Sequence, residues 1–262
     1  MLVAERHAKI VNILNEKGSI RVTELSQIFR VTEETIRRDL ERLEAEGKLC
    51  RSHGGAIRCK ENTSEPPYFE REVIHVEEKM EVAREALQYI KPYDRIILDA
   101  SSTAWYMAKI LPDLPLTVLT NSMKVGLELA NKEKISVIVT GGKMLTKSLS
   151  FVGPLTETAL DEYRVNKVFM SCQGIDREWG VSDSNEMQAI VKKKFMSVSN
   201  QVYLLVDNSK FGIKSFSRVS SLAEIDFIIT DSKTDNSQVQ LFREAGIEVK
   251  RSRAIKDYSL KK

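Results

Sequence analysis

Residues 31–56 read VTEETIRRDLERLEAEGKLCRSHGGA, and this stretch decides the fold of the first part of the chain. Thr32 is suited to cap a helix, which we expect to end at Gly47. At 100° per residue the apolar side chains of this helix form one stripe, which consists of Ile36, Leu40 and Leu43. Arg38 points almost directly away from the stripe. Its neighbours on that face are Glu34, Thr35 and Arg42. The stretch therefore predicts an amphipathic helix with one charged face.

Two further helices are expected upstream. The periodicity of residues 4–17 is helical, and Thr23 is suited to cap a short helix that ends at Phe29. The expected buried side chains of the short helix are Leu25 and Ile28. A tight connection then leads to the helix that Thr32 begins. This spacing is typical of a helix-turn-helix, at about residues 20–39, whose second helix lies in the major groove of DNA.

Downstream, residues 48–58 read as two short strands around a Gly54-Gly55 turn. We expect this hairpin to form a wing that presents Arg51, His53 and Arg58. The charge distribution favours contact between this region and an anion. Residues 1–60 contain 12 Lys and Arg against 9 Asp and Glu, whereas residues 61–262 contain 28 of each.

These features have two interpretations. A small helical domain with a solvated charged face would show the same helix pair. The wing and the localised positive charge favour a winged helix-turn-helix DNA-binding domain, which we place at residues 1–58. Arginine can pair with guanine, threonine can contact a thymine methyl group, and further arginines can hold phosphates. The candidate DNA-binding residues are Thr23, Thr32, Glu34, Thr35, Arg37, Arg38, Arg42, Arg51, His53 and Gly54.

The quoted stretch, with its TIRRDL core and its Gly-Gly wing, is very similar to the signature of the DeoR family of bacterial transcription regulators. The resemblance covers the N-terminal part of the chain through Arg58. It implies a mostly α-helical winged helix-turn-helix that binds double-stranded operator DNA. Thr32 stands where serine is usual, and this preserves the helix cap.

A linker is expected at residues 59–75, because CKENTSEPPYFE (59–70) combines polar residues with Pro66-Pro67. Beyond it, short β-branched runs alternate with amphipathic segments, which predicts an α/β domain with a mostly parallel sheet at residues 76–262. The expected strands are 95–99, 117–120, 136–140, 167–171, 202–207 and 227–230. The expected helices are 77–90, 102–111, 123–131, 154–162, 187–198 and 236–245.

Polar groups follow five of the expected strands, and parallel sheets bind ligands at the carboxyl ends of their strands. The groups are DASST at 99–103, TNS at 120–122, TGG at 140–142, GID at 174–176 and DNSK at 207–210. One such motif is more often a plain helix cap than a ligand loop. Five at corresponding positions favour a ligand site, in which Lys210 can neutralise a phosphate and Asp99 and Asp176 can accept hydrogen bonds from sugar hydroxyls.

The order DASST, TNS, TGG, GID, NEMQ, VDNSKFG resembles the C-terminal sensor domain of the DeoR family, whose fold is similar to ribose-5-phosphate isomerase. The resemblance implies that the domain binds a phosphorylated sugar, which alters operator affinity, and that it also serves oligomerisation. Ser101 stands where glycine is common in the family. The effector-binding residues that the resemblance implies are Asp99, Ser101, Ser102, Thr103, Asn121, Gly141, Gly142, Asp176, Glu186 and Lys210.

Several classes of protein are disfavoured by composition. The chain has 262 residues, 42% hydrophobic and 29% charged, which fits one or two globular domains. No apolar stretch has the length of a membrane span, and charges within the first ten residues argue against a signal peptide, so we expect a cytoplasmic protein. Three cysteines and three histidines lack metal-ligand spacing, and neither a Walker A motif nor GxGxxG is present, so no metal and no cofactor are expected.

The sequence thus predicts a transcription regulator, in particular a repressor of a carbohydrate operon that a phosphorylated sugar relieves. We expect a homodimer or homotetramer, because one recognition helix reads too few base pairs for selectivity. One alternative is an activator of the same class. The other is an isomerase-like enzyme in which Glu186, Asp176 and Lys210 move a proton, but such an enzyme has no evident use for the first 58 residues. No catalytic residue is therefore assigned.

Overall fold

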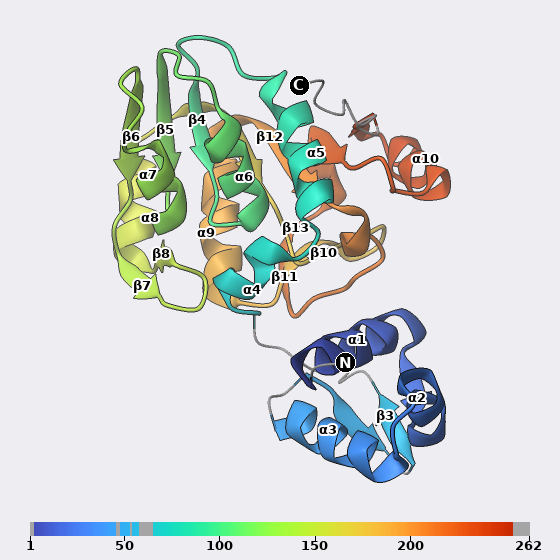
Figure 1. Cartoon of the computed structure of the whole chain (residues 1–262). Helices are drawn as coiled ribbons and strands as arrows, with labels where there is room; N and C mark the ends of the chain where they lie inside the picture. Colours follow the sequence, from blue (N-terminus) through green and yellow to red (C-terminus); the bar gives the residue numbers. More distant parts are fainter. Residues whose placement is uncertain (1–2, 46–47, 53, 58–64, 254–262) are drawn as a thin grey trace, which may run out of the picture. The chain divides into compact units, whose positions relative to one another are not determined.

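A computed structural model describes residues 3–45, 48–52, 54–57 and 65–253 of the chain. The chain forms two compact units, Met1–Asn62 and Thr63–Lys262, and each is described by itself (Figure 1). Gly47, His53 and Arg58, which the sequence analysis singled out, lie outside the described residues.

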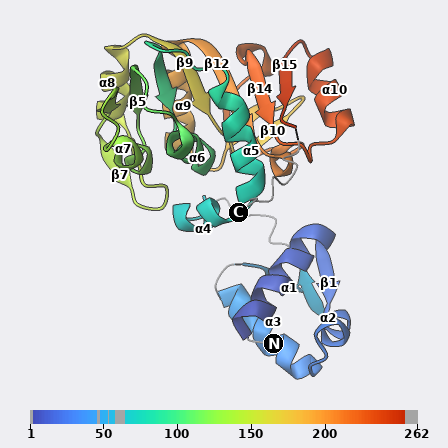
Figure 2. The same ribbon diagram turned by 45° about the horizontal axis from the view of Figure 1, so that its top comes forward.

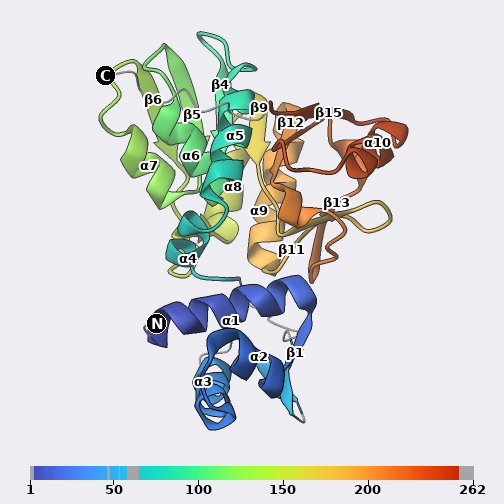
Figure 3. The ribbon, with the colours of Figure 1, turned by 45° about the vertical axis from the view of Figure 1, so that its right-hand side comes forward.

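The described residues of the first unit form three helices and a small sheet (Figure 3). The helices are α1 (Val3–Lys17), α2 (Val22–Phe29) and α3 (Glu33–Ala45). The strands β1 (Ser19–Arg21), β3 (Gly55–Ile57) and β2 (Cys50–Ser52) form an antiparallel sheet in that order. The predicted apolar stripe of α3 is confirmed, because Ile36, Leu40 and Leu43 are buried in the core of this unit.

Details of the first unit differ from the prediction. The helix α2 begins at Val22, and its N-cap residue, Arg21, provides no side-chain cap, so Thr23 lies within the first turn instead of capping it. Ile28 is 47% exposed, whereas Leu25 is buried as expected. The predicted cap of α3 is confirmed, since the hydroxyl of Thr32 accepts a hydrogen bond from the amide of Thr35 at 3.3 Å.

The strand β1 was not predicted, and it explains why the wing needs a glycine. β3 pairs with β1, and a Cβ atom on Gly55 would lie 2.3 Å from the backbone oxygen of Ile20. The hairpin of β2 and β3 is confirmed as an antiparallel pair in which Arg51 lies opposite Ala56.

The second unit is built on a seven-stranded parallel sheet, which confirms the α/β prediction. All six expected strands are present, and β15 is an additional edge strand beside β14, as Figure 2 shows. Their order across the sheet is β15 (Glu248–Arg251), β14 (Phe227–Thr230), β12 (Ser199–Val206), β9 (Val165–Met170), β4 (Arg95–Leu98), β5 (Leu116–Thr120) and β6 (Ile135–Val139).

Helices cover both faces of this sheet, because its strands alternate side chains between two apolar clusters. On one face lie α5 (Val76–Leu87), α6 (Ser102–Ile110) and α7 (Met123–Leu129). On the other lie α8 (Pro154–Asp161), α9 (Glu186–Ser197) and α10 (Asn236–Glu244). Smaller antiparallel groups are β7 (Lys143–Leu145) with β8 (Ser150–Val152), and β10 (Gly174–Asp176) with β11 (Gly180–Asp183) and β13 (Ser217–Ser220).

The expectation of a linker through residue 75 was wrong in its second half. Tyr68–Val73 forms a helix, α4, that belongs to the second unit. Tyr68 is fully buried, and the amide of this residue donates to the backbone oxygen of Lys147 at 2.6 Å. Pro66-Pro67 precedes α4. Proline is tolerated at the start of a helix, because the N–H that it lacks would have no partner within the helix.

Candidate nucleic-acid interface and ligand site

The charged face of α3 is open to solvent. The side chain of Arg38 is 74% exposed and pairs with Glu34 at 2.7 Å, and Arg37 pairs with Glu33 at 2.8 Å. Both are i,i+4 pairs on a helix surface, which contribute little stability, so DNA phosphates or bases can replace the carboxylates at small cost.

A groove separates α3 from the wing. It encloses about 430 Å³ and is lined by Arg37 and Glu44 on α3 and by Arg51 and Gly54 on the wing side. Arg51 pairs with Glu44 at 2.8 Å and with Glu41 at 3.0 Å, so these contacts fix the wing arginine beside the recognition helix.

Most of the predicted DNA-binding residues are exposed to solvent. Those that are exposed are Thr23, Thr32, Glu34, Arg37, Arg38, Arg42, Arg51 and Gly54. Thr35 is half-buried, and its hydroxyl lies 2.9 Å from that of Thr32.

The sequence analysis missed the ion pair that holds α3 in place. Asp39 is buried, and it accepts hydrogen bonds from Arg6 on α1 and pairs with the neighbouring His7 at 2.9 Å. Burial alone would raise the pKa of Asp39, but the bonds from Arg6 and His7 outweigh it and hold the pKa below its usual range.

In the second unit, Asp99 is the centre of a polar site at the carboxyl edge of the sheet. It follows β4 and is fully buried. Its carboxylate accepts from the hydroxyl of Ser101 at 2.6 Å and from the amide of Ser171 at 3.1 Å. The Ser101 hydroxyl in turn caps α6 by accepting from the amide of Ala104 at 3.0 Å. The first turn of α6, with buried Ser102 and Thr103, therefore begins beside a buried carboxylate.

Lys192 on α9 lies between two acidic side chains. Its Nζ donates to Asp183 and to the backbone oxygen of Ser171, and lies 3.5 Å from Asp99. Burial by itself would lower the pKa of Lys192, but the two carboxylates outweigh burial and raise it. Lys192 is thus a buried cation of the site at neutral pH.

Several buried polar atoms around this site have no hydrogen-bond partner among the described residues. They include Tyr68 Oη, Asn121 Oδ1 and Ser184 Oγ. Asn121 follows β5 and donates its amide to the backbone oxygen of Phe151 at 3.0 Å. Because an unpaired buried polar group is costly, these atoms are candidates for hydrogen bonds to a polar ligand or to water.

Lys210 follows β12 on the same edge of the sheet. It is half-buried, and within the described part of the chain it forms no ion pair. It acts electrostatically on Cys172, after β9, and on Lys79, at the start of α5. Lys79 donates to the backbone oxygens of Arg71 and Ile74, and burial lowers its pKa to about 8.

Gly142 has a packing role, and Gly141 has a conformational one. Gly142 has φ of 115°, and a Cβ atom there would lie 2.2 Å from the Thr156 hydroxyl. That hydroxyl donates to the backbone oxygen of Gly141 at 2.7 Å. Close approach to the start of α8 therefore explains Gly142 without a ligand, whereas Gly141 has open space around it and a φ of 64°.

Asp176 and Glu186 are not brought into the buried cluster. The Asp176 carboxylate accepts from the amides of Glu178 and Trp179 and pairs with Lys214 at 3.4 Å, so it shapes the β10–β11 hairpin. Burial alone would raise the pKa of Asp176, but these hydrogen bonds and Lys214 outweigh burial and lower it. Glu186 is exposed at the first turn of α9.

The site contains residues that the sequence analysis missed. Lys192 had a detectable signal, because Gln188, Val191, Lys192 and Phe195 form the buried i, i+3, i+4, i+7 stripe of α9. Asp183 is the last residue of β11, a strand that was not predicted. Tyr68 was assigned to a linker and therefore not considered.

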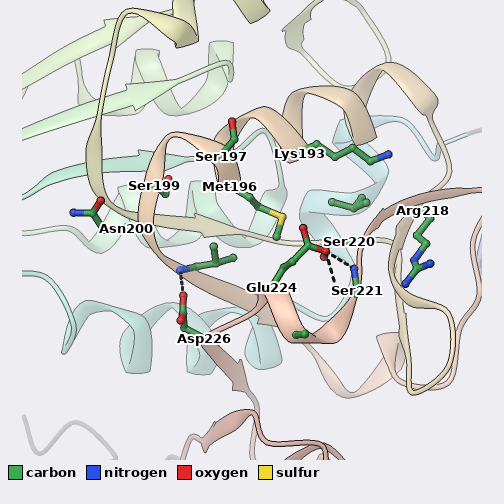
Figure 4. A pocket seen from close by; sticks show the side chains of 13 residues that line it. Lys193, Met196, Ser197, Ser199, Asn200, Arg218, Ser220, Ser221, Glu224 and Asp226 are labelled. Atoms are coloured by element: carbon green, nitrogen blue, oxygen red, sulfur yellow. Dashed lines mark hydrogen bonds between the residues drawn. The ribbon is translucent and has the colours of Figure 1, made fainter.

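A hollow larger than the groove beside α3 lies in the second unit, away from the polar site around Asp99. It encloses about 760 Å³ between the C-terminal end of α9, β13 and the start of β12 (Figure 4). Lys193 and Arg218 line it together with Glu224 and Asp226, which accept hydrogen bonds from Ser221 and Val202. It is at the amino end of β12, away from the carboxyl edge that holds Asp99.

The described residues contain no group of His, Cys, Asp and Glu side chains arranged to hold a metal ion. Among those residues, no helix is both long enough and apolar enough to cross a membrane.

Comparison with known proteins decides the family. Residues 6–62 match the model of the DeoR-like helix-turn-helix domain, and residues 74–232 match that of the DeoR C-terminal sensor domain. The chain belongs to the DeoR family of transcriptional regulators. The HTH-type transcriptional regulator YulB of Bacillus subtilis is 57% identical over 95% of this chain and 96% of its own length.

Other DeoR-family relatives include both modes of regulation. The L-fucose operon activator of Haemophilus influenzae is 40% identical, over 89% of this chain and 94% of its own. The HTH-type transcriptional repressor GlcR of Bacillus subtilis is 33% identical, over 95% of this chain and 96% of its own. Among solved structures, ribose 5-phosphate isomerase A of Methanocaldococcus jannaschii is 21% identical with a TM-score of 0.38, over 51% of this chain and 53% of that one.

Proposed function

We propose that this DeoR-family regulator controls a carbohydrate-metabolism operon and that a phosphorylated sugar alters its operator affinity. The observation that carries the ligand assignment is the set of unpaired buried polar atoms beside Asp99 and Lys192, at the carboxyl edge of the parallel sheet. The name of the L-fucose operon activator supports a role in carbohydrate metabolism.

The two ends of a sugar phosphate suit different parts of this edge. The first-turn amides of α6 and the half-buried Lys210 are suited to phosphate oxygens. Sugar hydroxyls can donate to the unpaired Oδ1 of Asn121 and accept from the unpaired hydroxyl of Tyr68.

On DNA, we assign base reading to the exposed face of α3 and phosphate contact to the wing. Arg38 is the most exposed of the paired arginines on α3 and is the candidate for a guanine contact. Arg51 beside the groove is suited to a phosphate. His53 stays a proposal from the sequence.

We further propose that the protein represses its operon as a homodimer or homotetramer. A protein bound over a promoter blocks transcription without any additional contact, and a symmetric pair of recognition helices doubles the base pairs that are read. Because chromosomal operators are its partner, we place the protein in the cytoplasm. A reporter gene whose expression falls when the regulator is deleted would indicate activation instead.

We propose no isomerase activity. An enzymatic reading needs Asp176, Glu186 and Lys210 together, but Asp176 is engaged by its hairpin and Glu186 is exposed. Incubation of the protein with pentose and hexose phosphates should yield no isomerised product, and turnover above a no-protein control would contradict the proposal.

One experiment tests the regulatory function. An operator is selected from a random duplex library, and sugar phosphates are screened by thermal shift, in which a ligand at 100 times its Kd stabilises the protein by about 2.7 kcal/mol. Compounds that stabilise should also change operator affinity. A panel in which no sugar phosphate does both would contradict the assignment.

A further inference from the structure

Glu65, three positions before the first residue of α4, has a buried carboxylate near the candidate ligand site. Glu65 is only 9% exposed, and its Oε1 lies 2.8 Å from Nη2 of Arg71 on α4. Its carboxylate also interacts electrostatically with Asp183, Lys192 and Asp99. Glu65 is therefore close enough to the polar cluster at the carboxyl edge of the sheet to feel its charges.

The ion pair between Glu65 and Arg71 is incomplete. Nε and Nη2 of Arg71 are buried, and neither forms a hydrogen bond of good geometry within the described chain. A guanidinium presents paired N–H groups that match the oxygens of a carboxylate or a phosphate. The fully buried hydroxyl of Tyr68, one helical turn before Glu72, is also without a partner, and it interacts electrostatically with Arg71 and Asp99. The guanidinium is suited to an incoming anion with several oxygens, and the Tyr68 hydroxyl beside it can donate to a sugar oxygen of the same ligand.

Glu65 itself is held at an energetic cost. Burial raises the pKa of its carboxyl, because desolvation and the nearby Asp183 and Asp99 outweigh the attraction of Arg71. A carboxylate in this position gains solvation when it leaves the site.

We propose that Arg71 binds the anionic group of the ligand and that Glu65 occupies Arg71 in the free protein, so that ligand binding exchanges the Glu65 carboxylate for a phosphate. This exchange rests on the proposed function, because it describes how ligand binding at the same site is regulated. A phosphate presents up to two negative charges and three acceptor oxygens to the open N–H groups of Arg71. The Glu65 carboxylate presents only one negative charge.

The exchange acts on the part of the chain that leads to the DNA-binding unit. Glu65 follows Asn62, the last residue of the first unit, by three positions. The helix α4 behind it is held independently, because the Tyr106 hydroxyl donates to the backbone oxygen of Glu72 at 2.8 Å and Lys124 pairs with the Glu72 carboxylate at 3.1 Å. Release of Glu65 thus changes the chain before α4 while α4 stays anchored.

Lys124 strengthens that anchor. Its ammonium lies over the rings of Tyr68, Phe69 and Trp105, at 5.3, 5.6 and 4.9 Å from the ring centroids. Cation–π contacts of this kind fix α4 against α6 and α7. Arg71 therefore stays in place as Glu65 leaves.

The test uses the full chain and inorganic phosphate as the probe, with affinity measured by calorimetric titration. Glu65→Gln keeps the shape of the side chain but removes its charge, and we expect it to bind phosphate at least tenfold more tightly than the wild type. The control is Glu70→Gln, the same charge change on an exposed position of α4, which should leave the affinity unchanged. Arg71→Lys should bind at least tenfold more weakly, because it loses the guanidinium fork.

The outcomes separate this exchange from the proposed function. Phosphate binding that Lys210→Ala weakens but Glu65→Gln leaves unchanged overturns the exchange and retains the sensor site. Absence of binding in every protein, with a sugar phosphate panel also silent, overturns the proposed function itself. If Glu65→Gln does not fold by circular dichroism, Arg71→Lys decides, since unchanged affinity in that variant overturns the role of Arg71.

Discussion

Arg6 on α1 and Asp39 on α3 form a buried, two-bonded ion pair, with Nε 2.6 Å from Oδ2 and Nη2 3.1 Å from Oδ1. Asp39 immediately follows Arg38, the main candidate for base contact. The ion pair therefore fixes the rotation of α3 about its axis next to Arg38. The orientation of the DNA-reading face thus depends on a contact with a helix 33 positions earlier in the chain.

Breaking this pair should destabilise the first unit. Arg6→Met leaves the buried Asp39 carboxylate with only His7, and we expect a loss of about 2–4 kcal/mol, seen as faster hydrogen exchange of the α3 amides. The control is Lys9→Met, which removes an exposed pair with Glu5 on the same helix and should cost about 0.5 kcal/mol or less. Equal exchange rates in the two variants would contradict the role of Arg6.

Arg38→Ala should weaken binding to the selected operator by about 1–3 kcal/mol and relax discrimination at one base pair, because an exposed arginine can pair bidentately with guanine. Fluorescence anisotropy with operator and random duplexes measures both effects. Lys9→Ala removes the same charge from α1 and serves as the control. An equal loss on operator and random DNA would reassign Arg38 to a phosphate.

Gly142 and Gly141 should respond differently to alanine. Gly142→Ala places a Cβ atom against the Thr156 hydroxyl at a φ of 115°, so we expect a loss of about 2–4 kcal/mol. Gly141→Ala has open space and a φ of 64°, so it should cost about 1 kcal/mol. Chemical denaturation checks both. If Gly141→Ala is the more harmful change, packing against α8 does not explain the glycine at position 142.

The stability should depend on pH through Lys79. Its pKa is about 8 in the folded chain, because burial lowers it from an ordinary value near 10.5. Between these values the unfolded chain binds more protons, so the free energy of unfolding contributed by Lys79 rises with pH, by at most about 3 kcal/mol. The wild type should therefore gain stability relative to Lys79→Met from pH 8 to pH 10. The comparison between the two proteins removes the titration of Cys172, whose pKa burial raises to about 12. A constant difference would show that Lys79 does not titrate in this range.

The sequence predicted elements whose pattern is local. The apolar stripe of α3 and the β-branched strands repeat at helix and strand periods, and both are confirmed because the periods place the side chains in the core. The helix α4 has only six residues and follows two prolines in a polar stretch, so its local sequence indicates a linker. Its position depends on Lys124 and Tyr106, which are distant in the chain.

The candidate site was predictable only in part for the same reason. Asp99 and Asn121 follow strands that have a clear β-branched pattern in the sequence. The topology of a parallel sheet therefore places both residues at one edge. Lys192 and Asp183 enter the site from α9 and from a short antiparallel strand, and no local pattern indicates that they meet. Asp176 carried the same apparent signal as Asp99, but its carboxylate is engaged by the turn of its own hairpin.

The most direct test of ligand control over DNA binding is the operator affinity of the wild type and of Lys210→Ala, titrated with a sugar phosphate that stabilises the wild type. Lys210 is a proposed phosphate partner in the second unit, so Lys210→Ala should bind the operator with wild-type affinity in the absence of ligand and require at least tenfold more ligand for the same change in affinity. Linkage also requires the operator to alter ligand affinity by the factor by which the ligand alters operator affinity. If Lys210→Ala loses operator binding while it remains folded and binds the sugar phosphate as the wild type does, Lys210 is not an effector ligand, and the site assembled from the strand ends must be redrawn.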